Sequence, residues 1–284
     1  MYIQMKLLTP RTDYNYTVQI SKNLNGTYDC SVTFHCYWNG NLNEKHFYSI
    51  LSCYYFNVFN NKHKIVLWLE NNTPNHFNEK LEEYCEIRQF SLEKERDNTN
   101  FVPKEFYYNK VLSYYSDVVR YLLLFNYGGC WFDLDCFFLR GFDPIFKVFE
   151  NYICVYQWEN QNYPNGAIFI SLKAKSEEMK NNINYIISRN KGWGFQEARL
   201  TYDMPMDMLV LPCSWFNGDW IQNPYNIGTI NFFKNSEKEY DFDNFFNGAF
   251  CYHWHNKWDM EIEENSVFAQ LVVIIENDLL KSRA

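Results

Sequence analysis

The chain of 284 residues carries a net charge of −8, and 20% of its residues are aromatic. The acidic balance argues against a nucleic-acid partner, because no basic stripe is present to displace counterions from phosphates. A hydrophobic content of 47% argues against extensive disorder, and the chain is long enough to bury a full core.

The nine cysteines indicate reduced thiols rather than a disulfide framework or a zinc site. They form no CxxC pair, and their number is odd. The first residues do not resemble a signal peptide, so we expect a cytoplasmic location. The longest apolar run, residues 267–275, is too short to span a bilayer, and no transmembrane segment is expected.

The N-terminal half begins with two recognisable patterns. Asn25-Gly26 lies between short polar and aromatic segments and predicts a tight β-hairpin within an N-terminal extension, residues 1–30. Residues 32–38 and 64–69 are apolar runs typical of buried strands, and residues 44–60 place apolar side chains at helical spacing between them. This order predicts a right-handed βαβ unit with parallel strands.

The remaining chain continues to alternate between strands and helices, which indicates an α/β fold. No linker or repeat interrupts it, so we expect one domain over residues 1–284. The expected elements are a short strand at 86–90, a charged loop at 92–100, a long helix from Pro103 to Asn126, a short aromatic strand that ends in Asp133-Leu134-Asp135, strands at 152–157, 167–172 and 208–211, a turn at 163–166, helices at 176–189 and 265–281, and a long loop region at 212–248.

Asp133 and Asp135 form the strongest candidate site. They follow an apolar strand, a Gly128-Gly129 break and a helix, and side chains at i and i+2 of a strand share one face. Two adjacent carboxylates suit a hard divalent cation. Without a cation or an arginine, two like charges beside a core strand would be costly.

An Asp-x-Asp pattern alone carries little weight, because it arises by chance in an acidic chain. Asp241-Phe242-Asp243 is a second example, and its charged, strand-poor surroundings predict a solvated loop. The first pair differs because Asp117 and Arg120 lie on the preceding helix. A surface ion pair at i,i+3 remains the alternative interpretation of Asp117 and Arg120.

The block Ser116-Asp117-Val118-Val119-Arg120, Tyr127-Gly128-Gly129 and Asp133-Leu134-Asp135 resembles the signature of the DXD sugar transferases, glycosyltransferase family 32. Relatives of that family include yeast α-mannosyltransferases, animal α-1,4-galactosyltransferases, capsular polysaccharide enzymes and, more distantly, the large clostridial glucosylating toxins. Trp131 stands where the family usually has tyrosine, which exchanges one flat amphipathic ring for another.

Three outlying segments extend the resemblance over residues 31–258. His35-Cys36-Tyr37-Trp38-Asn39-Gly40 resembles the family's first strand, and Asn165-Gly166 resembles the Asn-Gly before a central strand. Residues 252–258 (YHWHNKW) resemble the terminal H-H-W-x-x-S-W, with Tyr252 in place of the first histidine and Lys257 in place of the serine. The ligand set at this end is therefore open.

The resemblance implies a GT-A fold: a mostly parallel central sheet with helices on both faces, in which residues 31–258 form the catalytic core and residues 259–284 a C-terminal helix. It implies that Asp135 binds Mn²⁺ or Mg²⁺ directly, that Asp133 is shared between the ion and the donor, and that His253 (alternatively His255) is the third ligand. The alternative interpretation of His253 is that it is a structural histidine in an aromatic strand.

The resemblance also implies a donor site for a nucleotide-diphosphate sugar. Asp117 and Arg120 would hold the sugar hydroxyls and complete the catalytic set with Asp133 and Asp135, and Trp38 would stack on the base unless it is only a core side chain. The other implied donor contacts are His35, Ser116, Trp131, Asn165 and Lys257.

The expected activity is metal-dependent, retaining transfer of a hexose from a UDP-sugar, favoured over GDP-mannose, to a glycan or another hydroxyl acceptor. A nucleotide-sugar hydrolase, in which water replaces the acceptor, is the alternative enzyme. An inactive glycan- or partner-binding protein of the same fold is the alternative outside enzymes, and an assembly or membrane-surface contact would fall to the final helix. The oligomeric state is not predicted.

Overall fold

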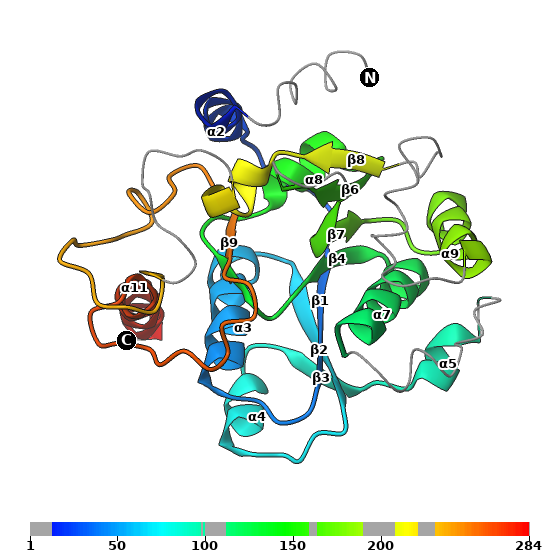
Figure 1. The fold of residues 1–284 in the computed structure, drawn as a ribbon, viewed down its shortest axis with the longest axis horizontal. Coiled ribbons are helices and arrows are strands. Elements are labelled where there is room, and N and C mark those ends of the chain that lie inside the picture. The colour runs from blue at the N-terminus through cyan, green and yellow to red at the C-terminus, as the bar shows by residue number, and fades with distance from the viewer. Residues whose placement is uncertain are drawn as a thin grey trace.

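The computed structural model describes residues 13–97, 99, 112–158, 164–189, 208–220 and 231–283. Nine strands are assigned in these ranges (Figure 1). Their bounds are β1 Thr33–Asn39, β2 Lys64–Glu70, β3 Glu86–Gln89, β4 Gly129–Phe132, β5 Cys136–Phe138, β6 Ile153–Tyr156, β7 Asn165–Ser171, β8 Met208–Leu211 and β9 Cys251–His253.

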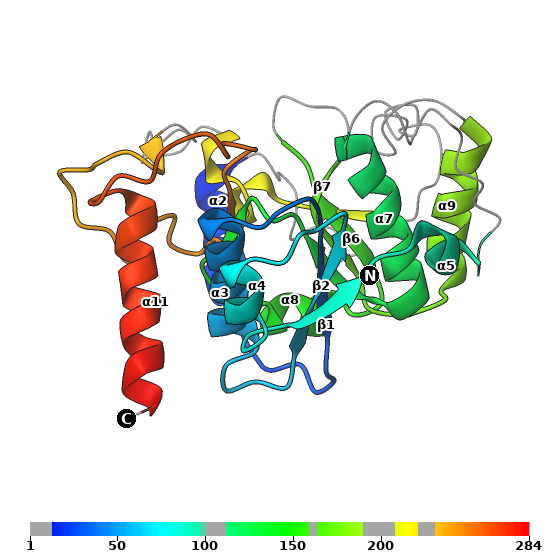
Figure 2. The ribbon, with the colours of Figure 1, turned by 90° about the horizontal axis from the view of Figure 1, so that it is seen from below.

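The helices surround these strands (Figures 1 and 2). Their bounds are α2 Tyr14–Asn23, α3 Glu44–Asn57, α4 His76–Leu81, α5 Leu92–Arg96, α7 Leu112–Tyr127, α8 Asp143–Phe149, α9 Glu177–Arg189 and α11 Val267–Arg283, with short 3-10 turns η2 Cys213–Trp215 and η3 Gly218–Trp220.

The central sheet has seven strands in the order β3-β2-β1-β4-β7-β6-β8. β1 pairs in parallel with β2 and β4, β2 with β3, and β6 with β8. β7 is antiparallel to both of its neighbours, β4 and β6. The expectation of a mostly parallel sheet is therefore confirmed, and the sheet order reverses between β1 and β4, where open α/β sheets bind ligands.

Helices cover both faces of the sheet, as expected. One face packs against α5, α7 and α9, and in β1 it uses Tyr37. The other face packs against α3, α8 and the β5–β9 ribbon, and in β1 it uses Phe34 and Cys36. The alternation follows the two-residue period of the strand, and Figure 2 shows α7 and α9 on one side of the sheet and α3 and α8 on the other.

The expected βαβ unit is confirmed as β1, α3 and β2. Asn43 caps α3: its side chain accepts the amide of His46 at 3.3 Å, and the ring of His46 accepts the amide of Asn43 at 2.9 Å. This reciprocal pair satisfies two amides at the helix start. The strands expected at 86–90, 152–157 and 208–211 and the helices at 176–189 and 265–281 are likewise present as β3, β6, β8, α9 and α11.

The expected N-terminal hairpin is wrong, because residues 14–23 form helix α2. Asp13 caps this helix by accepting the amide of Tyr16 at 2.9 Å. Trp215 donates its indole N–H to the carbonyl of Thr17 at 2.8 Å, and Arg140 donates to the carbonyl of Ser21 at 2.8 Å. Contacts with distant residues therefore decide the helix, and Asn25-Gly26 lies after it rather than within a strand pair.

Two smaller expectations are also wrong. The charged segment at 92–100 begins with helix α5, which Ser91 caps by accepting the amide of Lys94 at 3.4 Å. Asn165 and Gly166, expected in a turn, are the first residues of β7. The start of the long helix at Pro103, the first twelve residues and residues 221–230 of the long loop region lie outside the described residues.

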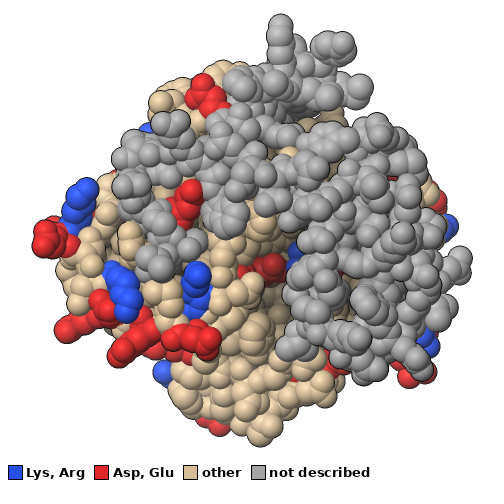
Figure 3. All heavy atoms as spheres, in the orientation of Figure 1, with Lys and Arg blue, Asp and Glu red and all other residues tan. Residues whose placement is uncertain are grey.

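The nine cysteines are all free thiols. Among the described residues no helix is both long and apolar enough to cross a bilayer. On the face drawn in Figure 3, acidic and basic side chains lie side by side at the left and lower left.

Candidate active site

Gly128 and Gly129 link helix α7 to β4 in a way that no other residue allows. Their φ angles are 66° and 115°. A Cβ on Gly129 would lie 2.2 Å from the carbonyl oxygen of Thr33, and one on Gly128 would lie 2.5 Å from that of Leu172. The two glycines therefore let the chain turn sharply between neighbouring strands, which places β4 beside β1.

The two aspartates lie in a turn, which corrects the expectation that they alternate along a strand. β4 ends at Phe132, and the amide of Cys136 bonds to the carbonyl of Asp133 at 3.0 Å, so that Asp133-Leu134-Asp135 turns the chain into β5. The amide of Asp133 is held by the carbonyl of Ala167 at 2.8 Å. The turn separates the roles of the two carboxylates, because each has different partners.

Arg120 joins the helix to the first carboxylate. Its Nη2 lies 3.0 Å from Asp117 Oδ1 and 3.2 Å from Asp133 Oδ1. The guanidinium lies 5.4 Å from the ring centre of Trp131, whose indole N–H donates to Asp133 at 2.7 Å. Arg120 is only 4% exposed, so the pair with Asp117 is buried and is not the surface ion pair of the alternative interpretation.

Burial makes these carboxylates harder to ionise. It raises the pKa of Asp117 to about 6, although the guanidinium of Arg120 opposes the shift. It also raises the pKa of Asp133, again opposed by Arg120 and reinforced by the negative charge of Asp135. One arginine is thus shared by two carboxylates, and its Nε has no hydrogen-bond partner within the described residues. A ligand that offers oxygen atoms would relieve this shortage.

The second carboxylate faces a histidine from the other end of the chain. β5 pairs antiparallel with β9, which aligns Cys136 with His253. His253 Nε2 lies 3.0 Å from Asp135 Oδ2, and His253 Nδ1 lies 2.7 Å from the hydroxyl of Tyr156. Both ring nitrogens of His253 therefore have a side-chain partner, one a carboxylate and the other a hydroxyl.

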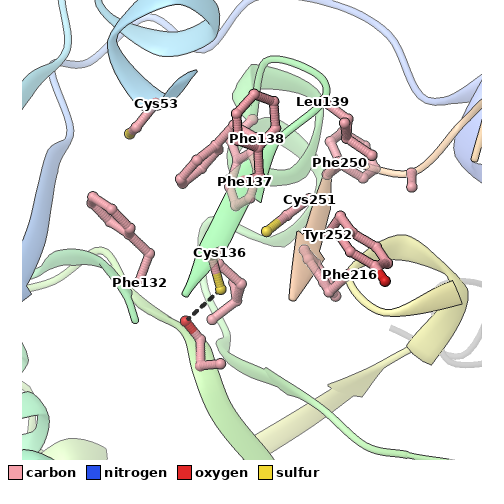
Figure 4. Close-up of a cluster of buried hydrophobic side chains, with 14 of the residues drawn as sticks. Cys53, Phe132, Cys136, Phe137, Phe138, Leu139, Phe216, Phe250, Cys251 and Tyr252 are labelled. Carbon is pink, nitrogen blue, oxygen red and sulfur yellow. Dashed lines mark hydrogen bonds between the residues drawn. The ribbon is translucent and has the colours of Figure 1, made fainter. Parts of the chain in front are cut away.

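An apolar cluster surrounds this ribbon. Figure 4 shows rings and thiols of β4, β5 and β9 together with Cys53 of α3 and Phe216, which follows η2, and the thiol of Cys136 donates to the carbonyl of Ala167 at 3.8 Å. The labelled members are Cys53, Phe132, Cys136, Phe137, Phe138, Leu139, Phe216, Phe250, Cys251 and Tyr252. Side chains packed this closely leave the ribbon little freedom to move.

The chain after β9 folds back onto Asp135. The amide of Asn256 donates to Asp135 Oδ2 at 2.8 Å, and His255 and Asn256 both have φ near 55° (56° and 54°). Burial alone would raise the pKa of Asp135, but the imidazole of His253 and the amide of Asn256 outweigh it and lower the pKa to about 2. Asp135 is therefore an anion, held by a backbone strained at two residues.

His255, the alternative third ligand, points elsewhere. Its ring lies 4.1 Å from that of His253 and contacts the side chain of Asn217. Burial, followed by the neighbouring His253, lowers the pKa of His255 to about 2, so this ring is neutral. A ring nitrogen of His253, by contrast, is hydrogen-bonded to Asp135 at 3.0 Å.

Two carboxylates and one imidazole have the donor chemistry that Mn²⁺ accepts. Asp133, Asp135 and His253 fit such an ion as a donor set, and the side chain of Asp133 is 27% exposed. They do not form a closed ligand shell: within the described ranges no three His, Cys, Asp or Glu side chains are grouped to hold a metal. Asp133 is turned toward Arg120 and Asp135 toward His253.

His35, in β1, lies beside the start of β4, whereas the cluster lies just beyond the end of β4. Its Nε2 lies 3.0 Å from the carbonyl of Gly128, and its Nδ1 accepts the indole N–H of Trp68 at 3.1 Å. Burial lowers the pKa of His35 to about 4. Both ring nitrogens of His35 thus have protein partners, and its expected donor contact stays a prediction.

Trp38 stands at the end of β1, half-buried, and donates its indole N–H to the carbonyl of Asn41 at 3.1 Å. Its ring contacts His46 and Trp258, with centroids 4.1 and 4.9 Å away. The two rings come from α3 and from the segment after β9. Trp38 therefore belongs to an aromatic group beside the cluster and not to the deep core.

The other expected donor residues border the cluster. Ser116 accepts from Arg120 at 3.5 Å, and Asn165, at the start of β7, accepts the amide of Ala167 at 2.7 Å. Lys257 is half-buried, and its carbonyl contacts Lys45. Tyr156, Asn256 and Lys45 were missed by sequence reasoning, since a tyrosine in a strand, a backbone amide and a helix lysine carry no motif.

Residues 55–150 match the family model described as the glycosyltransferase sugar-binding region containing the DXD motif. This range includes Asp117, Arg120, Asp133 and Asp135, whereas the segments of Trp38 and His253 lie outside it. No curated protein matches the sequence.

Several solved glycosyltransferases are similar in structure. The apo form of the glycosyltransferase GlyE of Streptococcus pneumoniae TIGR4 is 14% identical, with a TM-score of 0.52, and the match covers 90% of this chain and 64% of that one. The PaToxG glycosyltransferase is 18% identical (TM-score 0.42, 74% and 76% covered). The galactosyltransferase LgtC, solved with donor and acceptor sugar analogs, is 8% identical (TM-score 0.44, 87% and 95% covered). Residues 55–150 therefore match the DXD sugar-binding region of glycosyltransferases, and the described part of the chain has the GT-A fold of solved glycosyltransferases.

Proposed function

We propose that this glycosyltransferase transfers a hexose from a nucleotide-diphosphate sugar, a UDP-sugar in preference to GDP-mannose, to a glycan or another hydroxyl acceptor. The observation that carries the proposal is the shared Arg120, which lies 3.0 Å from Asp117 and 3.2 Å from Asp133 beside the Asp135–His253 pair. The cluster combines one cation with three carboxylates, an arrangement suited to a ligand that has both hydroxyls and a diphosphate.

Each side chain has a distinct part in this proposal. Asp117 would accept hydrogen bonds from the sugar hydroxyls. Arg120 would bind a diphosphate oxygen with the N–H groups that its two carboxylates leave unused. The negative charge of Asp133 and Asp135 would repel the diphosphate unless a cation lies between them, which is why we propose a divalent ion, Mn²⁺ or Mg²⁺, held by Asp133, Asp135 and His253.

The reaction exchanges one bond to the anomeric carbon for another. The bond from the acceptor oxygen to that carbon forms, the bond to the diphosphate oxygen breaks, and the acceptor proton leaves with the diphosphate. When bound, the ion would neutralise the leaving diphosphate. Retention of configuration, which the resemblance implies, would place the acceptor on the face from which the diphosphate departs, so no protein base is required.

The base would lie against Trp38, on the side of the cluster where β1 ends. An indole ring can stack on uracil or on guanine, and the preference for UDP rests only on the resemblance of the first strand to the UDP-glucose-using toxins. The match covers only 64% of GlyE, so the acceptor is not inferred from GlyE and must be identified by the assay.

The test is release of nucleoside diphosphate from a panel of UDP-hexoses and GDP-mannose with Mn²⁺, with and without glycan acceptors. Asp135→Asn should abolish release while leaving the circular dichroism spectrum unchanged. Asp243→Asn is the matched control, because Asp243 belongs to the exposed second Asp-x-Asp pair and should tolerate the same substitution. An active, metal-independent Asp135→Asn protein would refute the proposal.

The acceptor arm of the assay separates the alternatives. Release that glycans do not accelerate would favour a nucleotide-sugar hydrolase. Absence of any Mn²⁺-dependent nucleotide binding by calorimetry would favour an inactive binding protein of the same fold.

A further inference from the structure

Lys45 is a buried lysine that the proposed chemistry does not use. It is the second residue of α3 and is only 4% exposed. Within the described residues no carboxylate lies within ion-pair distance of it: each recorded salt bridge involves other side chains. A lysine in this position loses most of its hydration, so its ammonium group must find partners in the protein.

Those partners are three backbone carbonyls of one short segment. Lys45 Nζ donates to the carbonyl oxygens of Lys257 at 2.5 Å, Trp258 at 3.1 Å and Met260 at 2.5 Å. An ammonium group has three N–H donors, so all three are used. Nζ also lies 4.1 Å from the ring centre of Phe233 and 5.5 Å from that of Trp254, which favours the charged form.

The next residue holds the same segment by stacking. The ring of His46 lies 4.3 Å from that of Trp258, with 18° between the planes. Its Nδ1 accepts the amide of Asn43, and burial lowers the pKa of His46 to about 3, so the ring is neutral. Lys45 and His46, both in the first turn of α3, thus contact the same short segment of chain after β9.

That segment, residues 256–260, touches both ends of the proposed donor site. At its start the amide of Asn256 contacts Asp135 at 2.8 Å, and in its middle the ring of Trp258 lies 4.9 Å from that of Trp38. The segment itself is half-buried or exposed and contains no helix or strand. No helix or strand of its own holds this segment, so its position depends on the contacts of Lys45 and His46, which we call the clamp.

We propose that Lys45 is a positioning residue: its ammonium group holds residues 257–260 in place between the Asp135 end and the Trp38 end of the donor site, and thereby sets the affinity for the nucleotide sugar. This inference rests on the proposed function. If the segment were loose, donor binding would have to order it, and the entropy cost would appear as weaker binding. The chemistry at Asp133 and Asp135 would be little changed once the donor is bound.

The clamp is tested without any substrate by limited trypsin digestion. Lys257 is a trypsin site whose carbonyl is one of the three that Lys45 holds. Lys45→Met keeps the aliphatic stem and removes the charge, so cleavage after Lys257 should accelerate by about tenfold or more. Lys80→Met is the control, because exposed Lys80 also lies near aromatic rings but donates to no backbone carbonyl within the described residues. Unchanged cleavage in Lys45→Met would overturn the clamp.

The consequence for the donor is tested by steady-state kinetics of diphosphate release in the full chain. In Lys45→Met we expect the donor KM to rise by about tenfold, with kcat within about threefold of wild type, and Lys45→Arg should recover part of the loss. A lower kcat at unchanged KM would overturn the positioning role. If Lys45→Met does not fold, Lys45→Gln, which also lacks the charge and is shorter, replaces it in both assays.

The two assays separate this inference from the proposed function. A wild-type chain that releases no diphosphate from any donor would refute the function, whereas the digestion would still decide the clamp. Faster cleavage with an unchanged donor KM would keep the clamp and refute its effect on the donor.

Discussion

The hydroxyl of Tyr156 offers a test of whether His253 acts as a metal ligand. Tyr156 is fully buried on β6, and its hydroxyl is hydrogen-bonded to His253 Nδ1 at 2.7 Å, while the other ring nitrogen faces Asp135. Tyr156→Phe removes one oxygen atom and leaves the ring, so the packing is preserved. The histidine then keeps a buried nitrogen without its partner, and only the contact with Asp135 at the other nitrogen orients the ring by hydrogen bonding within the described residues.

The expected cost has two parts. An unsatisfied buried polar atom costs about 1–3 kcal/mol, so the free energy of unfolding should fall by that order. A histidine ligand that loses the group orienting it typically weakens metal binding by about 10- to 100-fold. We therefore expect the Mn²⁺ concentration for half-maximal activity to rise by about 10- to 100-fold, with activity recovered at saturating Mn²⁺.

The assay is a Mn²⁺ titration of diphosphate release, combined with urea unfolding of the same samples. Tyr48→Phe is the matched control, because Tyr48 donates to Glu276 at 3.0 Å between α3 and α11, away from the cluster. The control should lose stability without a change in Mn²⁺ dependence. If Tyr156→Phe lost stability with the same Mn²⁺ dependence as wild type, His253 would not be a ligand oriented by Tyr156.

Two further predictions concern stability. Gly129→Ala should reduce the free energy of unfolding by about 3 kcal/mol or more, because φ of Gly129 is 115° and the new Cβ would lie 2.2 Å from the carbonyl oxygen of Thr33. Gly40→Ala is the control: φ of Gly40 is 118°, but the nearest atom to a new Cβ is 3.7 Å away, so urea unfolding should show a smaller loss. Equal losses in the two variants would contradict the steric argument. Burial raises the pKa of Asp219 from 3.8 to about 7 against the hydrogen bond from Tyr252. The folded state therefore holds this proton more tightly than the unfolded state, so the contribution of Asp219 to stability is present below about pH 4 and is lost as the pH rises toward 7. Asp219→Asn should flatten this part of the dependence of the melting temperature on pH, and identical slopes in both proteins would contradict it.

Local patterns in the sequence determined the βαβ unit and the DXD segment. Apolar runs at β1 and β2 mark buried strands because both faces of a parallel sheet are covered, and helical spacing marks α3 because one of its faces meets that sheet. The Gly-Gly break was recognisable because glycine alone adopts the backbone required there. Asp117 and Arg120 were recognisable because burying a charged side chain costs free energy, so charges on an apolar helix indicate a paired or functional site.

Only the tertiary structure decided how these pieces meet. Residues 14–23 became a helix, and not part of a hairpin, because η2 and Arg140 lie against it. The pairing of β5 with β9 brings His253 to Asp135 across 118 residues of chain, and Tyr156 and Lys45 gain their roles from the same packing. Distant contacts can override the local preference of a short segment, as in residues 14–23, and the partner of a buried polar group is set by which distant elements share the core.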